Sequence, residues 1–455
     1  MSFLDENYLL SGETAKTIYQ QIAGLPILDA HNHADVKRIA DNIPFNNPWE
    51  LFAATDHYVW EIERKCGVAE EFITGKASDQ EKWHELCRVF PLFAGNPVYE
   101  WVHLDLRFLG VDAILCEAVA DETWEKLCKI LASEECLPQN LVRRMNIEVM
   151  CSTDDPLDAL KDHDKAEQAF GKRLIRPTWR PDKAMNIFKP DWNHYIDCLS
   201  VATSRNIDFL KNLVDTLQVT HDRFAKAGTI ASDHGIECPY DGDASEEEVK
   251  EIFHKVRIEK QAPTAEESAK FGSYMLKKFA EMDAEKGWVF QLHIGAVRDV
   301  RSSLFNTLGP DSGGDVSDHM IDIVKPLCRF LDKFDNKLKC VLYCLDPGHQ
   351  ADLATVSRAF GAKVKLGSAW WLNDTPIGME RQLEYIGSVD VLSQFAGMVS
   401  DSRKLLSYAS RFNMFRRVLS NTLGNMVDRG QMPLENAIEI GKIMSYSGPK
   451  NFFGF

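Results

Sequence analysis

The sequence has 455 residues, of which 45% are hydrophobic and 26% charged. These fractions are typical of a globular protein with a large core and exclude a disordered chain. Lys and Arg number 52 against 68 Asp and Glu, which gives a net charge of −16. So acidic a chain is poorly suited to polyphosphates or anionic lipid surfaces, and we expect neither a nucleic-acid nor a membrane partner.

Cysteine usage bears on the compartment. Eleven cysteines are scattered singly, with no CxxC pair. An odd number without a disulfide framework is typical of a reducing environment. No run of about 18 apolar residues indicates a membrane span, and the N-terminal residues show no signal-peptide pattern. The sequence therefore predicts a soluble, cytoplasmic protein.

Short apolar runs alternate with longer helical patterns, as in parallel α/β folds. The first run lacks the glycine-rich turn of a dinucleotide-binding sheet, which favours a (β/α)₈ barrel of the TIM type, formed as one domain by residues 1–455. Eight strands are predicted: Pro26–His33, Glu148–Thr153, Leu174–Arg180, Thr229–His234, Trp288–His293, Lys339–Leu345, Val364–Trp370 and Ala396–Asp401.

More than a hundred residues separate the first predicted strand from the second. Helical patterns fill this stretch, for example over residues 81–90 and 121–132. We interpret residues 40–145 as a helical insertion on top of the barrel, where it would act as a lid.

Several predicted strands end in polar residues, at the edge where such barrels carry their active sites. His31 and His33 end the first strand two residues apart, so they point to the same side. Asp401 ends the last strand, which adjoins the first in a closed barrel, and His293 ends the fifth. Imidazoles and a carboxylate suit Zn²⁺ or a similar divalent ion. We predict one such ion, with His293 as a further ligand or a substrate contact.

This arrangement resembles the amidohydrolase superfamily. The fourth strand ends in Ser232–Gly235 and the sixth in Cys344–Pro347, without the extra ligands of binuclear members, so a single metal is inferred. Further stretches resemble uronate isomerase, also called glucuronate isomerase: residues 55–58, 179–182, 291–298, 369–374 and 397–403. The resemblance implies an aldose–ketose isomerase that interconverts D-glucuronate with D-fructuronate, and D-galacturonate with D-tagaturonate.

Such an isomerisation moves a proton between C2 and C1 through an enediol, so it needs a base and a group that stabilises an oxyanion. Asp401 is our candidate base, in agreement with the resemblance, and it is left open whether it acts as ligand, base or both. His57 or Tyr58, in the insertion, would polarise the carbonyl or carry a hydroxyl proton.

Three arginines, Arg180, Arg298 and Arg403, lie at or just after strand ends. A guanidinium binds a carboxylate through two parallel hydrogen bonds, and we expect these three to hold the carboxylate of the hexuronate substrate.

Three further residues at strand ends complete the predicted site. Asp233 is expected to bond a sugar hydroxyl or to cap the following helix. Trp370 and Trp371 would form an apolar wall against the sugar, with one of the pair in the core.

Some positions depart from the family pattern, namely Glu61, Glu100 and the stretch 410–417. They favour a shifted substrate preference over a lost activity. Two alternatives remain: a mononuclear hydrolase of the same superfamily and a non-catalytic barrel that binds or assembles. A homo-oligomer is expected. His349 is left without a role, and six other histidines are expected to face solvent: His84, His163, His194, His221, His254 and His319.

Overall fold

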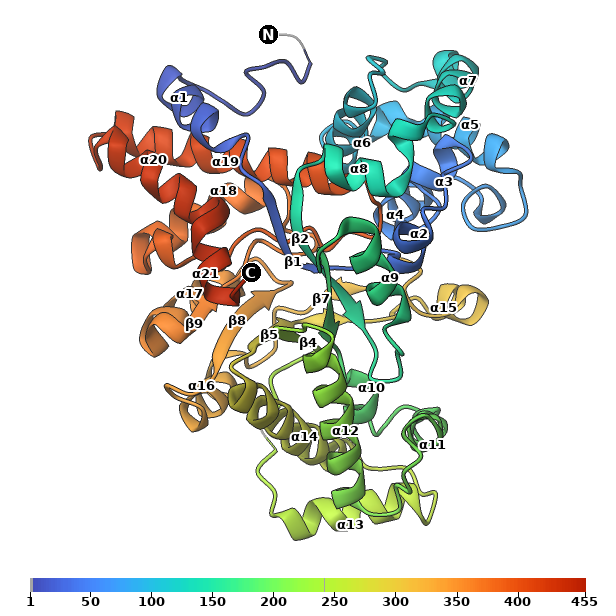
Figure 1. Ribbon diagram of the computed structural model, residues 1–455, viewed down its shortest axis with the longest axis vertical. Helices are drawn as coiled ribbons and strands as arrows, with labels where there is room; N and C mark the ends of the chain where they lie inside the picture. Colours follow the sequence, from blue (N-terminus) through green and yellow to red (C-terminus); the bar gives the residue numbers. More distant parts are fainter. Residues whose placement is uncertain (1–2, 241) are drawn as a thin grey trace.

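A single curled sheet of parallel strands forms the centre of the protein in a computed structural model that describes residues 3–240 and 242–455 (Figure 1). The strand order is β1-β2-β3-β4-β5-β8-β9, with every neighbouring pair parallel. This architecture confirms the predicted α/β barrel class. The strands are β1 (Ile27–Asn32), β2 (Ile147–Asp154), β3 (Ile175–Trp179), β4 (Ala231–Ile236), β5 (Val289–Ile294), β8 (Lys339–Cys344) and β9 (Val364–Leu366), and a separate antiparallel hairpin pairs β6 (Ala296–Val297) with β7 (Val316–Ser317).

The prediction of an eighth strand over Ala396–Asp401 was wrong, because no strand is assigned there. The segment nevertheless lies between β9 and β1 and bonds to both. The amide of Ala396 donates to the Leu366 carbonyl, and the amide of Asp401 donates to the His31 carbonyl, each at 3.1 Å. We call residues 396–401 the closing segment. The barrel is thus completed by single hydrogen bonds and not by a continuous ladder.

Local backbone conformation explains why the closing segment is not a strand. Gly397 has φ of 109° and Asp401 has φ of 49°, both outside the region that a β-ladder requires. Between them, the Ser400 amide donates to the buried carboxylate of Asp29 at 2.9 Å, and the Ser400 hydroxyl donates to the same carboxylate. A side chain thereby replaces the carbonyl partner that a neighbouring strand would offer.

The interior of the barrel is partly polar. All six residues of β1 and of β5 are buried. Gln291 on β5 donates to the carbonyl of Ala30 on β1 at 3.0 Å and accepts from the Tyr343 hydroxyl on β8 at 3.0 Å. These bonds satisfy the buried amide and link strands from different parts of the barrel.

Helices fill the connection between β1 and β2, as predicted, and they gather in one group at the upper right of Figure 1. They are α2 (Val36–Asp41), α3 (Pro48–Phe52), α4 (His57–Lys65), α5 (Asp79–Val89), α6 (Pro97–Phe108), α7 (Ala120–Leu131) and α8 (Pro138–Arg144). The buried Lys404 ammonium, just beyond the closing segment, lies 3.1 Å from Asp56 and 3.9 Å from Asp105. The insertion is therefore joined to the segment that completes the barrel.

The other helices surround the sheet. None of the described helices is long and apolar enough to cross a membrane. The helices outside the insertion are α1 (Glu13–Ile22), α9 (Lys161–Phe170), α10 (Asp182–Met185), α11 (Trp192–Thr203), α12 (Leu210–Lys226), α13 (Glu246–Arg257), α14 (Ala265–Lys286), α15 (Ser302–Leu308), α16 (Val324–Lys333), α17 (His349–Phe360), α18 (Pro376–Val389), α19 (Ser407–Asp428), α20 (Leu434–Lys442) and α21 (Gly448–Phe453).

One buried acid in the insertion makes stability depend on pH. Glu63 on α4 is fully buried, and neither carboxyl oxygen has a hydrogen-bond partner. Burial raises the pKa of this carboxyl to about 9, above the value of about 4.3 expected in the unfolded chain. The folded state therefore loses stability as the pH rises from about 4.3 to about 9. We expect the stability gain of Glu63→Gln over the wild type to be larger at pH 8 than at pH 5 by roughly 4 kcal/mol, as measured by urea unfolding at the two pH values.

The exposed Glu384 on α18 provides the matched control. Glu384→Gln should leave the unfolding free energy unchanged at both pH values. An equal gain for Glu63→Gln at pH 5 and pH 8 would contradict the role assigned to the buried carboxyl.

Candidate metal centre and active site

His31 near the end of β1 and His33 directly after it meet Asp401, which ends the closing segment. Nε2 of His31 lies 3.1 Å from Oδ1 of Asp401, and Nε2 of His33 lies 3.2 Å from the same oxygen. One potential ligand atom from each of the three residues lies within 4.8 Å of the other two. The side chains of His33 and Asp401 keep 27% and 13% of their surface exposed, so this triad faces the barrel mouth.

A second group lies deeper in the barrel and shares His31. Nδ1 of His31 lies 3.4 Å from Oδ2 of Asp233 on β4, and Nδ1 of His293 on β5 lies 2.8 Å from Oδ1 of Asp233. All three side chains are at most 2% exposed. The Arg180 guanidinium, just after β3, is 3.3 Å from the same Asp233 carboxylate. Asp233 thus contacts the Arg180 guanidinium and the imidazoles of His31 and His293. His33 and Asp401 lie on the other side of His31, toward the mouth.

Several imidazole nitrogens of the deeper group have no hydrogen-bond partner. Among the buried polar atoms without a hydrogen-bond partner are Nδ1 of His31 and both ring nitrogens of His293. Buried polar groups are otherwise almost always paired. Two imidazoles and one carboxylate that converge with an open side match the three-ligand set of a catalytic zinc site.

Charge–charge interactions set the protonation states. Burial works against the ionised form of both acids, but Arg180, His31 and His293 hold the pKa of Asp233 well below its ordinary value. Hydrogen bonds from His31 and His33 do the same for the pKa of Asp401. Both carboxylates are therefore ionised at neutral pH and available to a cation.

Trp370 and Trp371 follow β9 and occupy different environments. The Trp370 indole donates to Oδ2 of Asp401 at 2.9 Å, and its ring lies 4.7 Å from that of His293. The Trp371 ring packs 5.5 Å from His57 and 5.3 Å beneath the Arg298 guanidinium. Both tryptophans are at most 5% exposed.

His57 and Tyr58 begin α4 and stack on each other at 5.3 Å. The Tyr58 hydroxyl donates to the Asp374 carboxylate at 3.0 Å and accepts from the Leu372 amide at 3.2 Å. Burial and the charge of Asp374 raise the pKa of Tyr58 well above its ordinary value, so the hydroxyl keeps its proton. Burial and the nearby Arg403 lower the pKa of His57, which keeps this imidazole neutral.

The three predicted arginines do not form one group. Arg180 bonds Asp182 at 3.0 Å in addition to Asp233. Arg298 and Arg403 instead converge on Asp311, whose carboxylate oxygen Oδ1 lies 3.5 Å and 3.3 Å from them. Arg298 also lies 3.1 Å from the Asp315 carboxylate, so Arg298 and Arg180 each contact two acids, and Asp311 is the carboxylate that Arg298 and Arg403 share.

Our sequence analysis did not identify Asp311, Asp374 or Arg411 as part of the site. Asp311 lies in the loop between α15 and β7, and no regular pattern places such a residue. The Arg411 guanidinium on α19 is 2% exposed, pairs with Asp374, donates to the Ser400 carbonyl at 3.1 Å and lies 3.9 Å from the Trp101 ring. The sequence did offer one signal for this buried ion pair: Arg411 lies beside Phe412 and close to Met414 in a helical pattern, and an arginine among apolar residues needs an acidic partner when it is buried.

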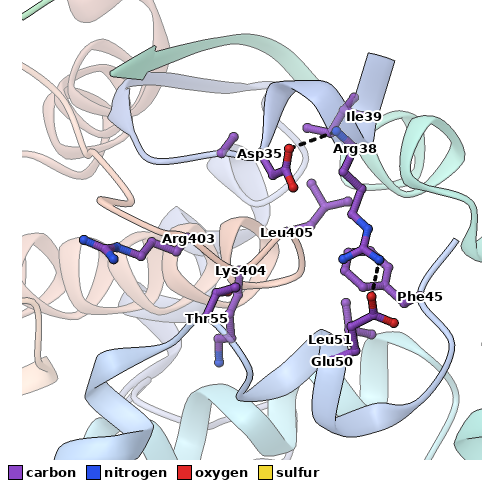
Figure 2. Close-up of a pocket in the computed structure, with 11 residues that line it drawn as sticks. Asp35, Arg38, Ile39, Phe45, Glu50, Leu51, Thr55, Arg403, Lys404 and Leu405 are labelled. Carbon is purple, nitrogen blue, oxygen red and sulfur yellow. Dashed lines mark hydrogen bonds and ion pairs between the residues drawn. The ribbon is translucent and has the colours of Figure 1, made fainter. Parts of the chain in front are cut away.

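A small pocket opens beside the cluster, between the β1 loop, the insertion and residues 403–405. Figure 2 shows Arg38 bonded to Asp35 and Glu50 on one side, with the Arg403 guanidinium pointing away on the other side. Arg403 thus lines this pocket and also lies 3.3 Å from the Asp311 carboxylate.

The fold and the histidine–aspartate cluster define an α/β-barrel protein with a candidate metal centre at the barrel mouth. The chain belongs to the glucuronate isomerase family, which it matches over residues 1–453.

Individual relatives agree with that assignment. The uronate isomerase of Thermotoga neapolitana is 47% identical over 452 residues, which cover 99% of each chain. The crystal structure of uronate isomerase from Thermotoga maritima has a TM-score of 0.97 and 46% identity, with both chains fully covered. A protein from Lactobacillus casei, assigned as a metal-dependent hydrolase, has a TM-score of 0.57 over 96% of this chain and 97% of its own. At 14% identity, that likeness supports the fold alone.

Metal binding at the mouth can be measured directly. An ion that binds only the folded state at 100 times its Kd stabilises that state by about 2.7 kcal/mol. We expect Zn²⁺ to raise the unfolding temperature of chelator-treated protein, and His33→Ala to weaken the tightest Zn²⁺ affinity at least about tenfold in calorimetric titration, because one imidazole ligand is lost. His84→Ala, at a half-exposed histidine in the insertion, should bind Zn²⁺ like the wild type. Equal affinities for the wild type and His33→Ala would exclude His33 as a ligand.

Proposed function

We propose that this chain is a uronate isomerase that interconverts D-glucuronate with D-fructuronate, and D-galacturonate with D-tagaturonate. The observation that carries the proposal is the arrangement of the mouth in a member of this family. A histidine–aspartate triad lies there with an ionised carboxylate, and two arginines nearby converge on a single carboxylate.

The proposed cofactor is one divalent ion, with Zn²⁺ favoured, held by His31, His33 and Asp401. Bound there, it would supply a Lewis acid for a substrate oxygen. The deeper group is less suited to a cation, because the Arg180 guanidinium already lies 3.3 Å from Asp233. Nδ1 of His31 lies 3.4 Å from Oδ2 of Asp233, on the side of the ring opposite to the Nε2 atom that faces Asp401 at the mouth. His293 holds Asp233 from the other side.

Asp401 is the proposed base that carries the proton between C2 and C1. Its Oδ2 accepts from the Trp370 indole and its Oδ1 faces the two histidines. A fixed carboxylate with one oxygen toward the ligand set and one held by a single donor keeps its orientation while it accepts and returns a proton.

His57 is better placed than Tyr58 to carry the hydroxyl proton. The Tyr58 hydroxyl is already committed to Asp374 and to the Leu372 amide. His57 is neutral, its Nδ1 is buried without a hydrogen-bond partner, and Glu61 is 3.8 Å away. Tyr58 then acts by holding the His57 ring in place through their stacking contact.

Arg298 and Arg403 form the proposed carboxylate clamp. The substrate carboxylate would take the place that Asp311 occupies between them. Arg180 compensates the charge of Asp233, which leaves the Asp233 oxygens to orient sugar hydroxyls and His31. The paired tryptophans provide the apolar surface that a sugar face requires.

The remaining expectations belong to this proposal. Residues 40–145 would act as the lid, which Lys404 ties to the barrel through Asp56. A reducing, cytoplasmic setting accords with eleven free cysteines. Apolar side chains on the surface, such as Leu92, Val201 and Phe209, at least 69% exposed, support a homo-oligomer.

The central test is a screen of hexuronates. With Zn²⁺ supplied, the wild type should convert D-glucuronate and D-galacturonate to their ketoses, followed by carbon-13 NMR. Asp401→Asn should lose about 10³-fold in kcat, because an amide cannot accept the proton. Its zinc content is measured in parallel, so that loss of the ion is told apart from loss of the base.

Asp428→Asn is the control, since Asp428 accepts from Thr14 on the outer helices at 2.6 Å. It should turn over like the wild type. Ketose formation by zinc-loaded Asp401→Asn at the wild-type rate would remove Asp401 from the base role. A zinc-loaded wild type that forms no ketose and hydrolyses amides or lactones would favour the hydrolase alternative.

The clamp makes a separate prediction about binding. Arg403→Lys should raise KM about tenfold, because a point charge cannot donate two parallel bonds to a carboxylate, whereas kcat should change little. Initial rates over a range of D-glucuronate concentrations give both constants. Arg381→Lys, on the exposed face of α18, should leave KM unaltered. An unchanged KM in Arg403→Lys would argue against the clamp.

A further inference from the structure

A second cluster of metal-ligating side chains lies apart from the proposed site. It consists of His319, Asp346 and His349, and one potential ligand atom from each lies within 4.8 Å of the other two. His319 comes from the loop after β7, Asp346 follows β8, and His349 begins α17. We call these three residues the rim cluster.

The geometry of the rim cluster is partly formed already. Nδ1 of His319 lies 3.0 Å from Oδ1 of Asp346, and the two imidazole rings stack at 5.1 Å with an angle of 10°. Asp346 also accepts from the Gly348 amide at 2.7 Å, which fixes its carboxylate. Two of the three ligands are held by the end of β8 and the start of α17, and the third is on a loop.

Burial separates this cluster from an ordinary surface ion pair. His349 is 5% exposed, and its Nδ1 is a buried atom without a hydrogen-bond partner. An imidazole that has been removed from water in this way needs a partner. His319, by contrast, has a side chain that is 70% exposed, so the cluster is open to an incoming ion on that side.

The absence of a side chain at Gly348 also favours an ion site here. Its φ of −68° is open to every residue type, so glycine is not required by the backbone. A Cβ at this position would, however, lie 2.9 Å from Oδ1 of Asp346 and 2.9 Å from the His319 ring. The missing side chain is what lets the histidine and the aspartate approach each other.

We propose that the rim cluster is a second cation site, for a borderline divalent transition ion such as Zn²⁺. Two imidazoles and one carboxylate are the donor set that such ions prefer, and Mg²⁺ or Ca²⁺ would ask for oxygen ligands instead. Ligand atoms around tetrahedral zinc are about 3.4 Å apart, and rotation of the exposed His319 side chain closes the cluster to that spacing. Solvent completes the coordination.

An ion at the rim cluster would restrain the loop between β6 and α16. The loop between β6 and α16 carries His319 and also Asp311, which lies between Arg298 and Arg403. An ion at the rim cluster fastens this loop to β8 and α17. The proposal does not depend on the reaction at the mouth, since it concerns binding and the order of a loop.

Metal stoichiometry tests the proposal. After equilibrium dialysis against about 10 µM free Zn²⁺, mass spectrometry should find two ions per chain in the wild type and one in His319→Ala. The double variant His31→Asn/His33→Asn should keep the ion at the rim. His254→Ala, at another exposed histidine beside a carboxylate, should bind as many ions as the wild type.

Two further measurements keep the result interpretable. Gly348→Ala retains every ligand but places a Cβ inside the cluster, and it should also lose one ion. Zn²⁺ should slow amide hydrogen exchange over residues 299–320 in the wild type but not in His319→Ala. Equal numbers of bound ions in the wild type and in His319→Ala would overturn the proposal, whether or not the mouth binds an ion.

Discussion

The contact between the closing segment and β1 is the constraint on which the rest of the site depends. Asp401 adopts a left-handed backbone conformation, donates its amide to the His31 carbonyl, and turns its carboxylate toward both histidines. A regular eighth strand would have continued the ladder and sent successive side chains to alternate faces. Because the ladder breaks here, residues that are 370 positions apart in sequence reach one point. The buried Asp29–Ser400 bonds hold the break in place.

Charge compensation is the second organising feature. Asp233 and Asp401 are buried close to imidazoles, and a buried carboxylate is costly unless it is paired. Arg180 compensates Asp233 on one side of His31, while no arginine bonds Asp401 among the described residues. Asp401 is therefore the carboxylate left to a cation from outside the chain. This asymmetry distinguishes the mouth from the deeper group although both contain His31.

The sequence could predict the parts of the site that follow from strand ends. His31, His33 and Asp401 were found because parallel strands bring their carboxyl ends to one edge, and the structure brings the three together. Residues in loops have no such rule, so Asp311 was missed. The prediction that His163 and His221 face solvent was wrong, because both side chains are buried. Asp154 and Asp283, which lie on other elements, pair with these imidazoles, and a helical pattern alone does not reveal such partners.

The same loop that escaped prediction connects the two metal proposals. A chain with a net charge of −16 must still attract an anionic sugar acid, so a local positive field has to outweigh the overall one. Arg298 and Arg403 supply that field at the mouth, and Asp311 and Asp315 oppose it while the loop lies against them. A ligand that holds the loop in place therefore also sets the strength of the positive field that the two guanidinium groups exert on the substrate. An ion at His319 would control this balance from outside the catalytic cluster, because the loop and not the barrel carries the competing carboxylate.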